Sequence, residues 1–176
     1  MTTKLYWIPG PWPGKLAVML RPRGEDWLDD EVAAWRRAGL DVVVSMLERE
    51  EAGQLGLALE GETAAESGIR FLSLPTADRG VPASIPEVQA LLHDVTGELA
   101  AGRSVAIHCR QGIGRSGLIA IGALIAAGID LDEAIETVSA ARGLPVPETE
   151  SQLQWLREFQ KLNLSANCTT RQLSPF

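Results

Sequence analysis

The sequence contains few residues that can form covalent cross-links or bind a metal ion. Its 176 residues include two cysteines, Cys109 and Cys168, and two histidines. Two cysteines, one of them close to the end of the chain, cannot form a disulfide framework, and this favours a reducing, cytoplasmic location. The cysteines and histidines do not have the spacing of a zinc site, so we expect no metal ion.

The sequence also lacks a long apolar segment and an excess of basic residues. Its longest nearly apolar run, Gly117–Ile129, has thirteen residues, whereas a helix needs about 20 to span a bilayer. Prolines interrupt the first twenty residues, where a signal peptide needs a continuous apolar core. The formal net charge of −7 argues against nucleic acid or an anionic membrane surface as a partner. A small cationic pocket for one anion remains compatible with this charge.

Strand-like and helix-like segments alternate along the chain, which predicts an α/β fold. We expect a single domain, residues 1–162, in which helices flank a mixed, mostly parallel sheet of about five strands. Residues 163–176 are polar and lack periodicity, so we expect a flexible C-terminal tail there. Strands are expected at Lys4–Ile8, Lys15–Leu20, Asp41–Leu47, Ile69–Leu74 and Ser104–His108. Helices are expected at Glu25–Ala38, within Glu48–Gly68, at Ser84–Ala100, around Gly117–Ile129, at Leu131–Ala141 and at Thr149–Lys161. The carboxylates of Glu48–Glu51 are expected to form a solvated face.

One segment combines the features of an oxyanion-binding site. The last expected strand runs directly into the loop CRQGIGR, residues Cys109–Arg115, and a helix follows. Gly112 and Gly114 allow the backbone to curl so that its N–H groups point inward, toward the N-terminus of the helix. Arg115 can bind a tetrahedral oxyanion in a planar, bidentate manner. Amide dipoles and an arginine both favour negative charge, so we expect Cys109 to be a thiolate at neutral pH.

The run His108-Cys109-x-x-Gly112-x-x-Arg115-Ser116 resembles the HCxxGxxR[S/T] motif of the cysteine-dependent protein tyrosine and dual-specificity phosphatases. The resemblance implies that Cys109 attacks phosphorus and forms a cysteinyl phosphate, and that Arg115 holds the equatorial oxygens. It also implies that Ser116 donates a hydrogen bond to the cysteine sulfur and that His108 orients the phosphate-binding loop. The main-chain N–H groups expected to bind the phosphate belong to Arg110, Gln111, Gly112, Ile113 and Gly114. No cofactor is expected, because the thiolate and the arginine take the place of a metal.

The same family supplies a proton to the leaving group from an aspartate in an earlier loop. Asp78, in the segment TADRGVP, precedes Cys109 by 31 residues. The segment resembles the acid-bearing loop of kinase-associated and related bacterial dual-specificity phosphatases, so we expect Asp78 to act as the general acid. Near the end of the chain, Glu148 falls where tyrosine-specific relatives place a water-positioning glutamine, and Gln152 falls at a second, more structural position. Glutamate departs from that pattern, so a role of Glu148 in positioning water stays open.

The resemblance implies a protein phosphatase that acts on phosphotyrosine and on phosphoserine or phosphothreonine in proteins or peptides, inhibited by phosphate-like oxyanions. A phosphatase of phosphoinositides or other small phosphomonoesters is the first alternative, although the loop adds only Arg110 to the charge of Arg115. A catalytically inactive, phosphate-recognising module is the alternative from another class. A rhodanese-type sulfurtransferase is disfavoured, because its loop typically has four residues between cysteine and arginine, whereas five are present here. The sequence does not indicate the oligomeric state.

Overall fold

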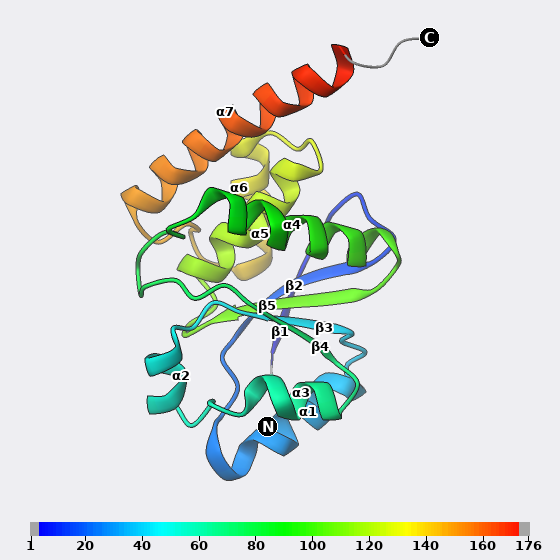
Figure 1. Ribbon diagram of the computed structural model, residues 1–176, viewed down its shortest axis with the longest axis vertical. Helices are drawn as coiled ribbons and strands as arrows, with labels where there is room; N and C mark the ends of the chain where they lie inside the picture. The colour runs from blue at the N-terminus through cyan, green and yellow to red at the C-terminus, as the bar shows by residue number, and fades with distance from the viewer. Residues whose placement is uncertain (1–3, 173–176) are drawn as a thin grey trace.

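Five strands form one mixed sheet in the order β1-β2-β5-β3-β4 in the computed structural model, which describes residues 4–172 (Figure 1). Strands β2, β5, β3 and β4 are parallel, and β1 pairs antiparallel with β2 as a hairpin. The bounds are Leu5–Ile8 for β1, Lys15–Leu20 for β2, Val42–Ser45 for β3, Arg70–Ser73 for β4 and Ser104–Cys109 for β5. The predicted α/β architecture and the five strands are confirmed.

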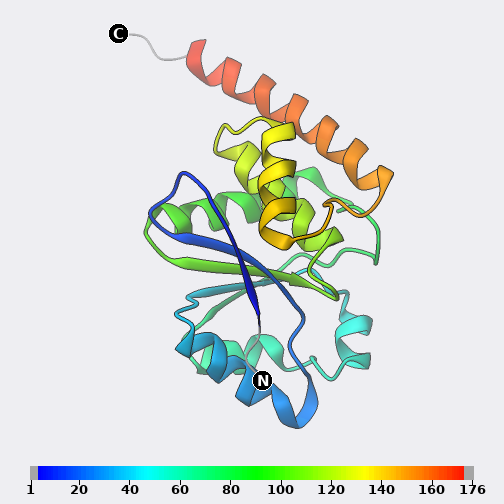
Figure 2. The same ribbon diagram turned by 180° about the vertical axis from the view of Figure 1, so that it is seen from behind.

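Helices cover both faces of this sheet, as Figures 1 and 2 show from opposite sides. One layer contains α1, α2 and α3, and the other contains α4, α5, α6 and α7. The bounds are Leu28–Arg37 for α1, Arg49–Gln54 for α2, Glu60–Glu66 for α3, Ile85–Ala100 for α4, Gly114–Ala126 for α5, Leu131–Arg142 for α6 and Glu150–Gln172 for α7. A short 3-10 turn, Glu25–Trp27, precedes α1.

The central strand β5 contributes to two separate hydrophobic clusters, because successive side chains of a strand point to opposite faces. Val105, Ile107 and Cys109 lie in the larger cluster with α4, α5, α6 and α7. Ala106 lies in the smaller cluster, which contains the apolar side chains of α1 and Ala64 of α3. The side chain of Cys109 is therefore on the α4–α7 side of the sheet.

Helix α5 is the buried core helix that its apolar sequence predicts. Every residue from Gly114 to Ile125 is buried. A Cβ atom at Gly117 would lie 2.3 Å from Cγ1 of Val146, so only glycine allows the segment before α7 to pack this closely. This packing places Glu148 and the start of α7 beside the N-terminus of α5.

Two helix ends illustrate where sequence signals act and where they are missing. Ser84 caps α4 as predicted, since its hydroxyl accepts a hydrogen bond from the backbone N–H of Glu87 at 3.3 Å. Helix α7 continues to Gln172, beyond the expected end at Lys161. No glycine or proline interrupts residues 150–172, so no breaker stops the helix. The division into a domain, 1–162, and a flexible tail, 163–176, stays a prediction.

The carboxyl ends of the four parallel strands meet at one edge of the sheet. Leu20 of β2 is in register with Cys109 of β5, and Ser45 of β3 is in register with both His108 and Ser73. The loops that follow β2, β3, β4 and β5 therefore meet at this edge, where α/β proteins commonly bind ligands. Among the helices described, none is both long and apolar enough to span a bilayer.

Candidate active site

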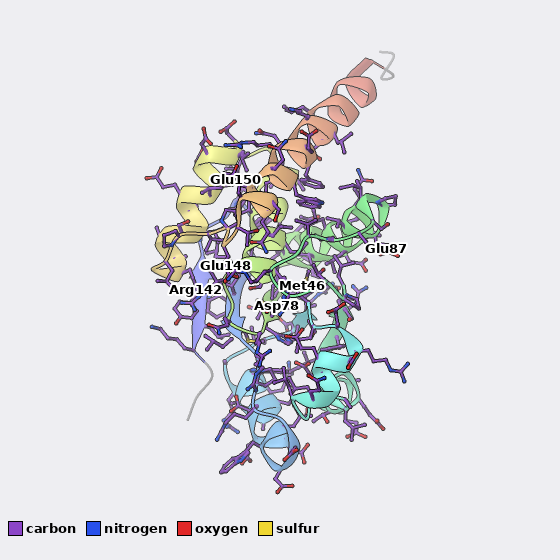
Figure 3. The ribbon with its side chains drawn as sticks, turned by 90° about the vertical axis from the view of Figure 1, so that its left-hand side faces the viewer. Met46, Asp78, Glu87, Arg142, Glu148 and Glu150 are labelled. Carbon is purple, nitrogen blue, oxygen red and sulfur yellow. The ribbon has the colours of Figure 1, made fainter. Side chains whose placement is uncertain are left out.

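A cavity of about 340 Å³ opens at this edge of the sheet. It lies between the loop after β4, the loop after β5 and the segment that precedes α7. Its lining residues are Asp78, Arg79, Cys109, Arg110, Gln111, Gly114, Arg115 and Glu148. Figure 3 shows Asp78 and Glu148 near one another at the level where the two helical layers meet, with Glu87 further away. Residues 70 positions apart in the sequence thus surround one space.

The loop after β5 is held in its curled shape by a glycine and by the end of β2. Gly112 has a φ of +65°, a conformation that L side chains rarely adopt. A Cβ atom at this position would lie 2.5 Å from the main-chain oxygen of Met19. The loop therefore lies directly against β2, and Gly112 is required both for its φ and for the space.

Cys109 is the last residue of β5, and α5 begins just after it at Gly114. The Cys109 side chain is 3% exposed, and its Sγ lies 3.4 Å from Oγ of Ser116 in the first turn of α5. The first N–H groups of a helix have no partner within the helix, and they favour negative charge nearby. The arrangement can hold an anion above a sulfur atom that itself has a hydroxyl as a hydrogen-bond partner.

Arg115 is buried among oxygen atoms that come from α2 and from the loop after β4. Its Nη1 and Nη2 donate to Oε2 and Oε1 of Glu51 at 2.7 and 3.0 Å, a bidentate contact with α2. Nη1 also donates to the main-chain oxygen of Thr76 at 2.9 Å, and Nη2 lies 3.0 Å from Oδ1 of Asp78. The guanidinium is fixed from the α1–α3 side and from the loop after β4 at the same time.

The contacts between Arg115 and Glu51 stabilise the charge of both groups. Burial opposes the charge of the Arg115 guanidinium, but the hydrogen bonds to Glu51 and the negative charges of Cys109, Glu51 and Asp78 outweigh it and raise the pKa of Arg115. The hydrogen bonds from Arg115 lower the pKa of Glu51 below its ordinary value, and burial only partly opposes this. Both groups therefore remain charged at neutral pH.

Glu51 is a residue of the site that the sequence does not indicate. The expectation that Glu48–Glu51 form a solvated face is wrong for Glu51, whose side chain is only 12% exposed. Helix α2 has no buried residue of its own, and Glu51 lies in a run of polar residues. Only the packing of α2 beside the loop after β5 brings the carboxylate to Arg115, so no local pattern could have identified it.

Asp78 and Glu148 lie at the mouth of the cavity, together with Arg79, which follows Asp78 in the same loop. The Asp78 side chain is 58% exposed, as a group that meets a substrate from solvent requires. Nη1 of Arg79 lies 3.4 Å from Oε1 of Glu148, so the loop after β4 is paired with the segment before α7. A Cβ atom at Gly114 would lie 2.7 Å from Oε2 of Glu148, which places this carboxylate over the loop after β5.

Gln152 connects two of these segments from within the protein. It is fully buried, and its Oε1 accepts hydrogen bonds from the backbone N–H groups of Glu148 and Thr149 at 3.1 and 3.3 Å. Its Nε2 donates to the main-chain oxygen of Gly80 at 3.0 Å. Gln152 thus ties the loop that carries Asp78 to the start of α7 and does not line the cavity.

His108 points away from the cavity. It is fully buried on the α1–α3 side of the sheet, with Nε2 2.8 Å from Oε1 of Glu60 on α3. Of the sequence-predicted site residues, Asp78, Cys109, Arg110, Gln111, Gly114, Arg115 and Glu148 line the cavity, whereas His108, Gly112, Ile113, Ser116 and Gln152 do not. Within the described part of the chain, no three His, Cys, Asp or Glu side chains form a group that could hold a metal ion.

Comparison with known proteins identifies the family. The model of the dual specificity phosphatase catalytic domain matches residues 34–162. The chain belongs to the dual specificity phosphatase family, a family of cysteine-based phosphatases. It is 33% identical over 130 residues to protein tyrosine phosphatase domain-containing protein 1 of Mus musculus and 32% identical over 137 residues to that of Bos taurus. These matches cover 69% and 73% of this chain but 17% of each of those proteins.

Solved phosphatase structures share the fold of this family member. A kinase associated phosphatase, solved with serine in place of its catalytic cysteine, superimposes with a TM-score of 0.83 at 20% identity and covers 93% of this chain and 97% of its own. Tk-PTP in its active form gives 0.70 at 28% identity, with 84% and 92% covered. PTPMT1 in complex with PI(5)P gives 0.72 at 23% identity, with 92% and 99% covered.

We expect Gly112→Ala to abolish oxyanion binding by this phosphatase-family chain, because a methyl group cannot fit between the loop and Met19. Gly102→Ala is the matched control, since Gly102 has a φ of +81° but open space around its Cα. The control is expected to lose only about 1–2 kcal/mol of stability from its positive φ. Vanadate binding measures the difference. Equal vanadate affinities of the two variants would contradict the role given to the close approach.

We expect Glu51→Gln to lower kcat/KM for an aryl phosphate by about 10²-fold, the order that a misplacement of about 1 Å costs a reacting group. The carboxylate, whose pKa is lowered on folding, contributes stability that is present above its ordinary pKa of 4.5 and is lost as the pH falls through the lowered value. The stability difference between wild type and Glu51→Gln is therefore expected to shrink as the pH falls below about 4.5.

Urea unfolding at several pH values measures this second effect. Glu50→Gln is the control on the same helix, because Glu50 is exposed and accepts a hydrogen bond from the side chain of Gln54. If Glu51→Gln matched Glu50→Gln in both activity and acid stability, Glu51 would have no role in positioning Arg115.

Proposed function

We propose that this chain hydrolyses phosphate monoesters of tyrosine and of serine or threonine in proteins, through a cysteinyl-phosphate intermediate. The observation that supports the proposal is the meeting of Cys109, Arg115 and Asp78 at one cavity. A thiol at the N-terminus of a helix, an arginine and an exposed carboxyl group are the three parts that a two-step phosphoryl transfer needs. The chain spans about 17% of the curated relatives it matches, so the activity is proposed for this segment.

In the first step, the Cys109 thiolate attacks phosphorus while the bond from phosphorus to the ester oxygen breaks. The phosphoryl oxygens lie against the amide groups of the loop and the Nη atoms of Arg115, which stabilise their charge. Asp78 gives its proton to the departing oxygen, so that the amino-acid hydroxyl leaves neutral. Its exposed position at the mouth of the cavity supports this assignment.

In the second step, water attacks the cysteinyl phosphate and the sulfur leaves as a thiolate. Asp78, now a carboxylate, takes a proton from the attacking water, and inorganic phosphate is released. Ser116, with Oγ 3.4 Å from the Cys109 sulfur, donates a hydrogen bond that stabilises the departing thiolate. Glu148, whose carboxylate lies over the loop after β5, is the accessory residue that would position the incoming water. Gln152 acts by holding the loop of Asp78 in place.

The overall charge of the protein favours a protein substrate over a phosphoinositide. Asp78 and Glu148 place two carboxylates at the mouth of the cavity, and Glu148 is paired with Arg79. Arg110 and Arg115 are the other cations that line the cavity, and no lysine lines it in the described residues. An anionic membrane surface that carries a phosphoinositide headgroup would be repelled by the formal charge of −7. A phosphorylated side chain brings one dianion, which Arg115 and the loop can neutralise.

The proposal is tested with phosphotyrosine and phosphothreonine peptides and a phosphoinositide in vesicles, each measured by phosphate release. We expect turnover of both peptides, weak turnover of the lipid, and no turnover by Cys109→Ser. Faster hydrolysis of the lipid than of either peptide would establish the alternative substrate class. No turnover by folded wild-type protein above the level of Cys109→Ser would show an inactive phosphate-binding module.

We expect Asp78→Asn to slow the hydrolysis of a phosphothreonine peptide by about 10²–10⁴-fold, the usual value of general acid–base catalysis. Its effect on an activated aryl phosphate is expected to be much smaller, because such a leaving group departs without a proton. Asp94→Asn serves as the control, since Asp94 pairs with Arg70 far from the cavity. Equal losses on both substrates would remove the acid role from Asp78.

A further inference from the structure

Arg142 contacts the loop after β5 from the side opposite to the cavity. It is the last residue of α6, and Gly143, with a φ of +74°, ends the helix directly after it. Its Nε donates to the main-chain oxygen of Gly112 at 2.7 Å, and its Nη2 donates to that of Gln111 at 3.1 Å. Arg142, labelled in Figure 3, does not line the cavity.

These two hydrogen bonds set the direction of two peptide groups. In a trans peptide the N–H points opposite to the C=O of the same unit. The oxygen of Gln111 shares its peptide unit with the N–H of Gly112, and the oxygen of Gly112 shares its unit with the N–H of Ile113. Because both oxygens are bound by Arg142, both N–H groups point away from it, toward the side of the loop on which the cavity lies.

The charge of Arg142 also strengthens those N–H groups as donors. A hydrogen bond to a carbonyl oxygen polarises the peptide unit, and chains of hydrogen bonds reinforce one another by about 10–30% per bond. Within the described residues, Arg142 has no carboxylate within ion-pair distance. Its guanidinium lies over the ring of Tyr6 on β1, 4.1 Å from the centroid, a cation–π contact that leaves its positive charge uncompensated.

We infer that Arg142 is a positioning residue for oxyanion binding: it orients and polarises the N–H groups of Gly112 and Ile113, and the ring of Tyr6 holds Arg142 in place. This inference rests on the proposed function, since the amides matter for catalysis only if a phosphoryl group occupies the loop. It adds β1 and the end of α6 to the elements that determine affinity for the phosphoryl group.

The test measures vanadate affinity through the protection of Cys109 from iodoacetamide, in a Cys168→Ser background so that one thiol is alkylated. We expect Arg142→Gln to weaken vanadate binding about tenfold, the lower end of what a hydrogen bond to a charged group contributes. The same factor is expected in kcat/KM. Arg142→Lys is expected to recover part of the affinity, because an ammonium group keeps the charge but lacks the planar fork that reaches both oxygens.

Tyr6 and a remote arginine provide the controls. Tyr6→Phe keeps the ring and is expected to bind vanadate as wild type does, whereas Tyr6→Leu is expected to weaken binding severalfold. Arg37→Gln removes an equal charge from the exposed end of α1 and is expected to have no effect. Thermal unfolding of each variant separates a local effect from loss of the fold; if Arg142→Gln unfolds, Arg142→Lys and the Tyr6 pair decide the outcome.

The inference would be overturned if folded Arg142→Gln bound vanadate as tightly as wild type. It would also be overturned if Tyr6→Phe and Tyr6→Leu bound vanadate equally and Arg142→Lys had wild-type affinity. The proposed function can fail separately. A wild-type protein that binds vanadate, loses it in Arg142→Gln, and hydrolyses no phosphate ester would preserve the positioning role and refute the enzymatic one.

Discussion

The structure depends on holding one arginine, almost completely buried, in a fixed position at the edge of the sheet. A buried guanidinium is costly unless hydrogen-bond acceptors surround it, and Arg115 has a bidentate carboxylate, a main-chain oxygen and a second carboxylate around it. These partners come from α2 and from the loop after β4, elements that are far apart in the sequence. The loops at the carboxyl ends of the strands are therefore organised around Arg115, and the cavity is the space that remains beside it.

A second constraint is that the loop after β5 has to be supported on its outer side. Gly112 lies against β2, and the oxygens of the loop that point outward accept hydrogen bonds from Arg142. Burying main-chain oxygens without donors would be unfavourable, so the end of α6 satisfies them. Gln152 likewise supports the loop after β4 and the start of α7, because its one buried carboxamide forms hydrogen bonds with two main-chain N–H groups and one main-chain oxygen. The walls of the cavity are thus fixed by hydrogen bonds that lie outside it.

The sequence predicts the parts of this protein that depend on local pattern. The buried run of β3, the cap at Ser84 and the strand–loop–helix around Cys109 each follow from the types and spacing of neighbouring residues. Asp78 could be proposed from the sequence because its loop resembles the acid-bearing loop of related phosphatases and precedes Cys109 by 31 residues. Glu51 and Arg142 could not, because each acts through a contact made only when two distant elements pack together. The direction of His108, away from the cavity toward Glu60, likewise follows from the alternation of β5 and from the presence of α3 beneath it.

The way α2 is attached has a consequence for how the protein behaves on longer timescales. This six-residue helix buries none of its residues fully, and it is attached to the rest of the fold by the contact of Glu51 with Arg115 and by the packing of Ala52 against the smaller hydrophobic cluster. Short helices with little buried surface open locally at a small free-energy cost. Each such opening withdraws a carboxylate from the arginine while both hydrophobic clusters stay intact. The rate of amide hydrogen exchange along residues 49–54 consequently reports how often Arg115 is released from Glu51. An oxyanion that competes for the same guanidinium therefore changes the exchange rate of α2 without contacting that helix.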